Sequence, residues 1–187
     1  MEARKVWTKT WKLPIKAKLK HIIWKLYKGW ISANSVLIRR GLNVEETCRR
    51  CGEGGESVHH KLFACDFAGL VWEMSPVKWD GLQHLTNQFS DWWDALMKIE
   101  KGEEVQARVE LSVYILWQIW KARNVWLYEG KKLEPMEVVQ RAMKEWGEFK
   151  QVQDHKKNTI GVERRSEGQQ VEKHLIKDSV GSIVLQK

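Results

Sequence analysis

Apolar side chains recur at helical spacing in several segments of the chain, and each segment ends near a glycine or a proline. The first segment lies between Pro14 and Gly29, and its apolar positions are Ile15, Leu19, Ile22, Ile23 and Leu26. Apolar residues three and four positions apart form one face of an α-helix, while proline suits its first turn and glycine its end. The spacing predicts an amphipathic helix whose other face is basic, with Lys16, Lys18, Lys20, Lys25 and Lys28.

Shorter patterns follow this helix. A helix is predicted from Ser35 to Arg40, capped by Ser32 or Asn34 and ended by Gly41. Ser57 is a suitable cap for a short helix leading towards Cys65, and Asp66 for the turn after it. The residues of that turn that we expect to face the core are Phe67, Leu70, Val71 and Trp72.

Three helical patterns occupy the second half of the chain. In the first, Ser90 is the expected cap, and the apolar positions are Trp92, Trp93, Leu96 and Ile99. The longest pattern runs from Glu103 to Tyr128, with an inner face of Val109, Val113, Leu116, Trp117 and Trp120. Pro135 begins the last, whose apolar positions are Val138, Val139, Ala142, Met143 and Trp146. Residues 151–187 are polar and charged, so a disordered tail is predicted there.

The 12 tryptophans mostly fall at the apolar positions of these patterns. They therefore predict a tryptophan-rich core, since a large aromatic ring stabilises a fold chiefly by burial. Trp7 and Trp30 lie beside lysines and are the best exceptions, because a ring flanked by cations can stack on a nucleic-acid base.

Composition and charge narrow the class of protein. Hydrophobic residues make up 43% and charged residues 30%, and no apolar run approaches the roughly 20 residues of a membrane span. The first residues lack the apolar region of a secretory signal, so we expect an intracellular protein, with the nucleus as a candidate compartment. Residues 1–50 carry 13 Lys or Arg against 3 acidic residues, whereas residues 51–150 carry 12 against 16. A polyanion would therefore meet the N-terminal segment first.

All three cysteines fall in one short segment together with a histidine. Cys48 and Cys51 are separated by two residues, eight residues lead to His60, and four more lead to Cys65. A two-residue gap lets both thiolates reach one tetrahedral ion, and a Cys3His set leaves no position open for a reacting water. The spacing predicts one structural zinc ion (Zn²⁺) bound by these four residues.

Two alternatives remain at this centre. The three cysteines could be reduced and simply buried, although the glycines beside the Cys-x-x-Cys pair suit a metal-binding turn. His59 is the competing ligand, and on a helix its imidazole would point about 100° away from that of His60. We choose His60 because it gives the four-residue gap to Cys65. Arg49 and Arg50 would offset the charge of the thiolates.

An ordered set of motifs resembles a known family. These motifs are Val6-Trp7 with Trp11, Trp24-Lys25-Leu26, the 34–41 run, Cys48-x-x-Cys51, Glu56-Ser57-Val58-His59-His60-Lys61-Leu62-Phe63-Ala64-Cys65, and Phe67-Ala68 with Val71-Trp72. Together they resemble the zinc-binding domain that follows the reverse transcriptase in plant LINE-type (non-LTR) retrotransposons. The resemblance implies the same four zinc ligands. Ile119-Trp120-Lys121-Ala122-Arg123-Asn124 and the helix after Pro135 resemble, more weakly, the helical linker that follows this domain. Lys20-His21-Ile22 departs from the family, which has a bulkier aromatic residue there.

The groups that a polymerase or a ribonuclease H would need are missing from the pattern. Tyr114 is followed by Ile115, Leu116 and Trp117 rather than by the paired aspartates that hold two catalytic metals. We therefore expect no enzymatic activity. The leading hypothesis is a nucleic-acid-binding module (RNA or DNA) whose contacts are the five helix lysines named above together with Arg49 and Arg50.

The alternative function is that of a structural or protein-interaction module, or a remnant open reading frame, in which the amphipathic helix docks a partner protein or an anionic membrane surface. In either case the expected fold is mainly α, with a small zinc-stabilised helical domain followed by a helical extension. The expected divisions are a zinc-binding domain over 5–75, the extension over 88–150 and the tail over 151–187.

Overall fold

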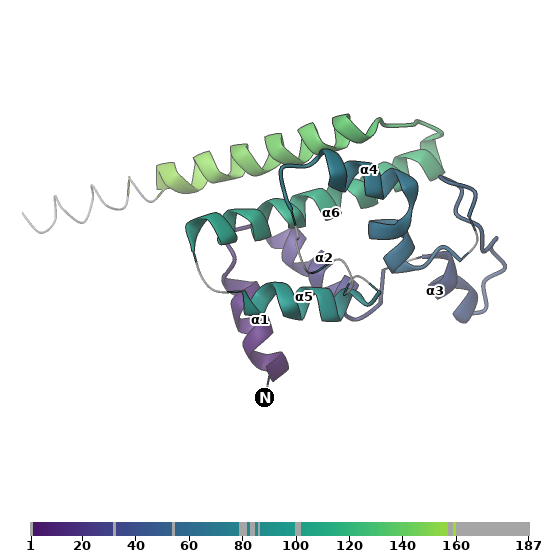
Figure 1. The fold of residues 1–187 in the computed structure, drawn as a ribbon, viewed down its shortest axis with the longest axis horizontal. Helices are drawn as coiled ribbons and strands as arrows, with labels where there is room; N and C mark the ends of the chain where they lie inside the picture. The colour runs from purple at the N-terminus through teal and green to yellow at the C-terminus, as the bar shows by residue number, and fades with distance from the viewer. Residues whose placement is uncertain are drawn as a thin grey trace, which may run out of the picture. The chain divides into compact units, whose positions relative to one another are not determined.

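The computed structural model is helical throughout its regular elements (Figure 1). It describes residues 2–31, 33–53, 55–78, 82, 85, 87–99, 102–156 and 159. Within these ranges there is no β-strand, so the expectation of a mainly α fold is confirmed. The helices are α1 (Glu2–Lys12), α2 (Ala17–Tyr27), α3 (Asn34–Arg39), the π-helical turn η1 (His60–Ala64), α4 (Asp66–Met74), α5 (Phe89–Lys98), α6 (Glu103–Glu129) and a last helix over 135–156.

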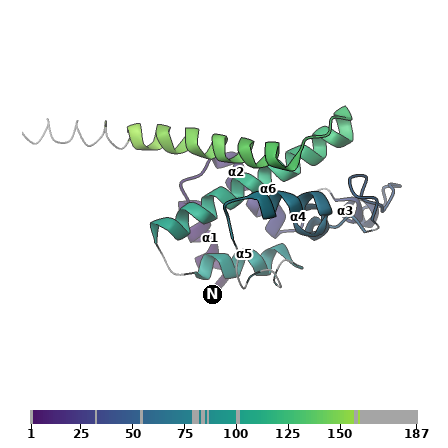
Figure 2. The ribbon, with the colours of Figure 1, turned by 45° about the horizontal axis from the view of Figure 1, so that its top comes forward.

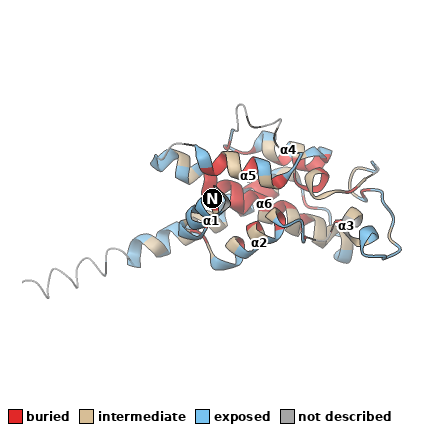
Figure 3. Ribbon diagram, turned by 90° about the horizontal axis from the view of Figure 1, so that it is seen from below, coloured by how far each residue is buried: buried red, intermediate tan, exposed pale blue. Residues whose placement is uncertain are grey.

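Helix α6 is the centre of the packing. Helices α2, α4 and η1 all pack against it, while α5 packs against α1 and α2 (Figures 1 and 2). Every residue from Val109 to Leu116 is buried, on all sides of the helix (Figure 3). A helix buried all round is surrounded by other elements instead of lying on the surface. The sequence predicts a single inner face, and the structure shows that Trp117 and Trp120 of that face are only half-buried.

Helix α2 matches the amphipathic helix expected from the sequence. Its buried residues are Leu19, Ile23 and Leu26, and Ile15 just before it is also buried. Gly29 ends it at φ 63°, a left-handed conformation that glycine adopts readily. Because this apolar face lies within the core, it is not a surface that a partner protein could occupy.

Helix α1 was not anticipated by the sequence pattern. Its buried side chains are Val6 and Thr10, so one of the two residues that face the core is polar. The Thr10 hydroxyl donates to the Val6 carbonyl at 2.9 Å and accepts a hydrogen bond from Trp93 Nε1 at 3.0 Å. A threonine that satisfies its own hydrogen bonds can replace an apolar residue at a buried position, which a search for apolar periodicity overlooks.

The expected tryptophan-rich core is only partly present, since among the described tryptophans Trp92 and Trp93 alone are buried, within an aromatic cluster formed by α4, α5 and η1. Phe63 stacks on Trp72 with ring centroids 5.9 Å apart and contacts Trp92 at 5.3 Å. Phe89 stacks on Trp93 at 6.1 Å. The polar edge of Trp72 is satisfied, because its Nε1 donates to the Leu62 carbonyl at 2.7 Å. These rings contribute burial without leaving unpaired indole N–H groups among the pairs described.

Several local expectations are wrong. Leu70, Ile99 and Met143 were expected to face the core but are 43%, 39% and 44% exposed. Leu70 and Met143 lie at the edge of their apolar stripes, whereas Ile99 lies just after the end of α5. Helix α5 starts at Phe89 with Gln88 as its cap, so Ser90 lies inside the helix, and Cys65 takes the capping position expected for Asp66.

The chain divides into two compact units, residues 1–147 and residues 148–187. The zinc-ligand segment and the described helices α5 and α6 therefore belong to one unit. The last helix begins at Pro135, as expected, and continues through residue 156, past the start of the predicted tail. The rest of that tail lies outside the described residues, apart from residue 159. None of the described helices is long and apolar enough to cross a membrane.

Glu145 fastens the last helix to α2 and α6. Its Oε1 accepts hydrogen bonds from Lys16 at 2.9 Å and pairs with Lys18 at 3.0 Å, while its Oε2 accepts from Gln118 at 2.8 Å. Burial opposes the charged form of Glu145, but the hydrogen bonds from Lys16 and Lys18 outweigh it and lower the pKa of the carboxyl. Two of the helix lysines are thus committed to an internal carboxylate.

We expect Glu145→Gln to lower the free energy of unfolding by about 1–2 kcal/mol at neutral pH, because it removes a partly buried negative charge shared by two cations. The measurement is denaturant unfolding of the zinc-loaded protein. Since the folded-state pKa of Glu145 is lowered, its contribution exists above the unfolded pKa and disappears as pH falls through the folded value. The matched control is Glu137→Gln, which breaks an exposed pair with Arg141 and should cost about 0.3–0.5 kcal/mol. Equal losses in both variants would contradict the assignment.

Candidate metal centre

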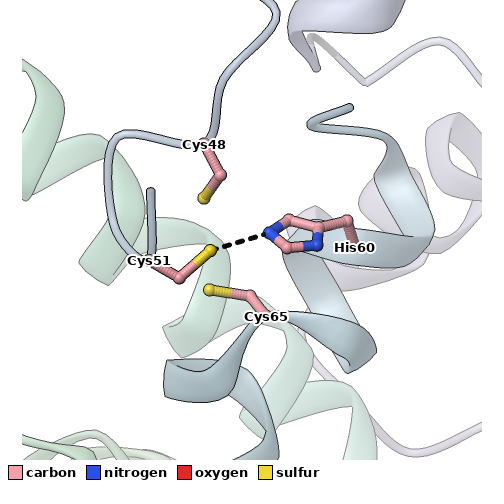
Figure 4. Close-up of side chains that lie close together, drawn as sticks. All are labelled: Cys48, Cys51, His60 and Cys65. Atoms are coloured by element: carbon pink, nitrogen blue, oxygen red, sulfur yellow. Dashed lines mark hydrogen bonds between the residues drawn. The ribbon is translucent and has the colours of Figure 1, made fainter. Parts of the chain in front are cut away.

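The three cysteines and His60 converge on one point (Figure 4). Their ligand atoms all lie within 4.8 Å of one another, and Cys51 Sγ lies 3.2 Å from His60 Nε2. Cys48, His60 and Cys65 are buried, and Cys51 is partly exposed. Among the described residues, these are the four that the sequence assigns to a zinc ion, including His60 in preference to His59.

The first two ligands stand on a tight loop. The Cys48 amide donates to the Glu53 carbonyl at 2.7 Å, and the Gly52 amide donates back to the Cys48 carbonyl at 2.8 Å. Gly52 has φ 84°, a left-handed conformation that closes this turn and that residues with a Cβ rarely adopt. The two thiols are consequently held on the same side of the loop, as one tetrahedral ion requires.

The last two ligands are brought together by a widened helical turn. Ser57 Oγ accepts a hydrogen bond from the His60 amide at 3.0 Å, so Ser57 caps this helix as predicted. The Cys65 amide donates to the His60 carbonyl at 2.7 Å, five residues back. On an α-helix two residues five positions apart point about 140° away from each other. A bond from residue i to residue i+5 closes one π-type turn, which returns Cys65 to the side of His60.

Cys65 also occupies the cap position of α4. The Gly69 amide donates to the Cys65 carbonyl at 2.8 Å, which is the first bond of that helix. The Phe67 amide hydrogen-bonds the Cys65 sulfur and by itself would lower the pKa of the thiol. An exposed amide at a helix start favours a negatively charged ligand. The same residue therefore begins α4 and completes the ligand set.

The thiols cannot all ionise without a cation. A hydrogen bond from Cys65 lowers the pKa of the Cys48 thiol to about 4, with help from the amides of Cys51 and Arg50. The same hydrogen bond, together with burial, raises the pKa of Cys65, and burial raises the pKa of Cys51. Cys48 therefore ionises more readily than Cys51 and Cys65. A divalent ion would replace the remaining protons and stabilise all three thiolates, so the donor set fits one structural zinc.

Arg50 supplies a positive charge beside this centre. Its guanidinium lies 3.7 Å from the centroid of the Phe67 ring, and its Nη2 donates to the Leu133 carbonyl at 2.5 Å. Burial lowers the pKa of Arg50, while the charges of Cys65 and Cys48 oppose that shift. Three thiolates and one Zn²⁺ would carry a net negative charge, which this guanidinium offsets. The expected charge compensation by Arg50 thus has a geometric basis.

The remaining predicted nucleic-acid contacts have different surroundings. Lys16 and Lys18 face Glu145, and Lys20 Nζ donates to the Trp11 carbonyl at 2.7 Å. Arg49 is exposed, with its Nε 3.7 Å from Glu45. Lys25 and Lys28 are exposed, and in the described part of the chain neither has an ion-pair partner. These two lysines are thus the most available of the predicted set.

A buried cluster of charged side chains connects the metal-binding loop to α6. The sequence analysis did not predict this cluster. Glu56 is 2% exposed and binds Arg123 of α6 through both carboxylate oxygens. Lys61 Nζ lies 3.6 Å from Glu56 Oε1, and burial lowers the pKa of Lys61 to about 8. Glu56 and Arg123 are 67 residues apart, so no local spacing rule could have paired them.

We expect Arg123→Gln to destabilise the zinc-loaded protein by about 3 kcal/mol, because it leaves a buried carboxylate with one partner fewer. In thermal unfolding this corresponds to a fall in Tm of about 6–12 °C for a chain of this size. The control is Arg108→Gln on the same helix, where the partner Glu104 is exposed and the loss should stay below about 0.5 kcal/mol. A loss no larger than that of the control would show that the cluster does not support the fold.

We expect one zinc ion per chain by elemental analysis, and loss of that zinc in Cys51→Ser and His60→Ala after dialysis against a competing chelator. The matched control is His59→Ala, which removes the neighbouring imidazole and should keep the metal. Chelation should first increase hydrogen exchange over residues 45–72, because metal binding and folding are coupled there. Zinc retention in His60→Ala with loss in His59→Ala would reverse the ligand assignment. Unchanged exchange after chelation would refute the structural role.

Comparison with known proteins agrees with this geometry. Residues 1–72 match a family model described as zinc-binding in reverse transcriptase. No curated protein and no solved structure gives a match to this chain. The matched range contains all four ligands and helices α1 to α3, and most of α4. Residues 1–72 are therefore similar to the zinc-binding domain that this family model describes.

Proposed function

We propose that this chain is a non-catalytic zinc-binding module, derived from the reverse transcriptase of a plant LINE-type retrotransposon, that binds nucleic acid through its basic N-terminal segment. One observation carries the proposal. From residue 3 to residue 44 the chain contains no Asp or Glu, and this acid-free stretch lies within the zinc-binding domain. A folded surface of one charge sign attracts a polyanion and releases its counterions on binding.

The ion pairs inside the fold reduce the number of basic side chains in the N-terminal segment that are free to contact phosphates. Lys16 and Lys18 are occupied by Glu145, whereas Lys25 and Lys28 project from the outer side of α2. Arg39 and Arg40 lie at the end of α3 and are also exposed. The proposed contacts therefore centre on the C-terminal half of α2, with Arg49 as a further exposed cation beside the metal loop.

The zinc ion has a supporting role in this proposal. It fixes the loop that carries Arg49, and its closed Cys3His set offers no position for a substrate. The alternative of docking through the apolar face of α2 has little support, because Leu19, Ile23 and Leu26 are buried inside the unit. The helices after residue 88, which resemble the family's linker, stabilise the metal-binding loop. Arg123 of α6 donates a hydrogen bond to Glu56 of that loop.

We expect the zinc-loaded protein to bind labelled RNA and DNA, with the logarithm of the binding constant falling linearly with the logarithm of salt concentration. Fluorescence anisotropy at several salt concentrations measures this. Lys25→Glu with Lys28→Glu should weaken binding about tenfold or more and reduce the salt slope by about 1.5. Zinc content and Tm should stay unchanged, because both side chains are exposed.

The matched control is Lys131→Glu with Lys144→Glu, which changes net charge equally at two other exposed lysines. Equal weakening by the two double variants would mean that total charge, and not the surface of α2, governs binding. No binding of wild-type protein to RNA or DNA at low salt would refute the proposed function.

A further inference from the structure

Two tryptophans are left exposed at either end of α2. Trp11 and Trp30 are 45% and 52% exposed, whereas the other tryptophans of the described residues are buried or half-buried. Exposing a large ring forgoes roughly 1.5–3 kcal/mol of burial. Both rings are therefore accessible to a ligand.

Trp11 is held in place against α2. Its carbonyl accepts the hydrogen bond from Lys20 Nζ at 2.7 Å, and its ring meets the edge of the His21 ring with centroids 5.7 Å apart. The interplanar angle is 77°, an edge-to-face arrangement that aromatic pairs prefer. Lys20 therefore positions Trp11, which gives this lysine a structural task in place of a phosphate contact.

Trp30 is positioned by the turn that ends α2. The Gly29 amide donates to the Leu26 carbonyl at 3.0 Å, and the Trp30 amide donates to the Lys25 carbonyl at 2.8 Å. This pair of bonds is a Schellman motif, which folds the chain back over the last turn of a helix. The Trp30 ring then meets Trp24 edge-on, with centroids 4.8 Å apart and an interplanar angle of 83°. The contact uses one side of Trp30 and leaves the rest accessible.

The two ring pairs lie on the same side of α2. His21 and Trp24 are three residues apart, so they lie about 60° apart around the helix and about 4.5 Å apart along it. The buried residues Leu19, Ile23 and Leu26 occupy the opposite side, by the same helical spacing. We call the rings of Trp11, His21, Trp24 and Trp30 the aromatic row. Lys25 and Lys28 project from the same outward side, by the same helical geometry.

Exposed rings beside exposed lysines suit one particular class of ligand. Unpaired bases stack on exposed aromatic side chains, while neighbouring cations follow the phosphates. We propose that the aromatic row binds single-stranded nucleic acid, with bases stacked on Trp11 and Trp30 and phosphates near Lys25 and Lys28. This inference rests on the proposed function and specifies its ligand. A duplex offers its phosphates to the lysines, but its bases are already stacked on one another.

A protein partner matches this surface less well. The core of a protein interface is depleted of lysine and has a contiguous apolar centre, whereas here the exposed Lys25 and Lys28 lie on the same side of α2 as the rings. The charge is also complementary to a polyanion, because no acidic residue occurs between residues 3 and 44. An anionic membrane surface shares that charge, and the experiment below distinguishes it.

The test compares Trp11→Ala with Trp30→Ala, combined in one zinc-loaded full-length chain, with wild type. The probes are a labelled oligothymidine of about 15 nucleotides, within the range that single-strand sites cover, and a DNA duplex of the same length. We expect the double variant to bind the oligothymidine about tenfold or more weakly, with duplex binding changed less than about twofold. Replacement of both tryptophans by Phe should retain most of the single-strand affinity.

The matched control is Tyr128→Ala, which removes an aromatic ring that is 79% exposed at the end of α6. It should bind both probes as wild type does. Zinc content and circular dichroism of each variant verify that the fold is retained.

Three results would overturn the inference. If the double tryptophan variant binds oligothymidine as wild type does, stacking on the aromatic row is wrong, although the proposed function survives if Lys25→Glu with Lys28→Glu still weakens binding. If wild type binds neither probe at low salt, the proposed function fails as well. If the double variant loses binding only to phosphatidylserine vesicles, the row is a membrane-contacting surface.

Discussion

The convergence of three thiols and one imidazole is the constraint on which the first part of this structure depends. The described residues of the loop, 41–53 and 55–57, contain no helix, and a loop of that length orders only if something offsets its conformational entropy. Here the four ligands close the loop onto η1 and α4, and the Glu56–Arg123 pair attaches it to α6. The metal ties the loop to its neighbouring helices, and the buried carboxylate ties it to a helix much later in the chain.

The sequence was sufficient for most of the helices and for the ligand set, and the reasons are local. Apolar spacing identified α2 and α6, glycine and proline marked their ends, and the spacing of the three cysteines, with the His60–Cys65 gap, pointed to the four side chains that converge. It was insufficient wherever a long-range polar contact decides the outcome. Helix α1 depends on a Thr10–Trp93 hydrogen bond, and Glu56 meets a guanidinium 67 residues away. Leu70 illustrates the opposite error. It is apolar and was predicted to be buried, but no neighbouring element covers it and it is 43% exposed.

The basic segment illustrates how one charge pattern can serve two purposes. Counted along the chain, its lysines look equivalent, but the structure separates them. Lys16 and Lys18 neutralise Glu145, and Lys20 positions Trp11, while Lys25 and Lys28 remain in solvent. A charge that is already paired inside the fold contributes little to attracting a polyanion. Net charge therefore overstates the number of contacts that such a surface can offer.

The π-type turn at His60 has a consequence for how this domain tolerates length changes. A bond from residue i to residue i+5 holds one residue more than an α-helical turn does. With three residues between the last two ligands, an ordinary α-turn would put both on one side of the helix; with the four found here, the wider turn does so. A change from the i→i+5 to the i→i+4 hydrogen bond could thus absorb the deletion of one residue between His60 and Cys65 while both ligands stay on the same side. Ligand spacing in such a domain is a property of the turn and not a fixed requirement of the ion.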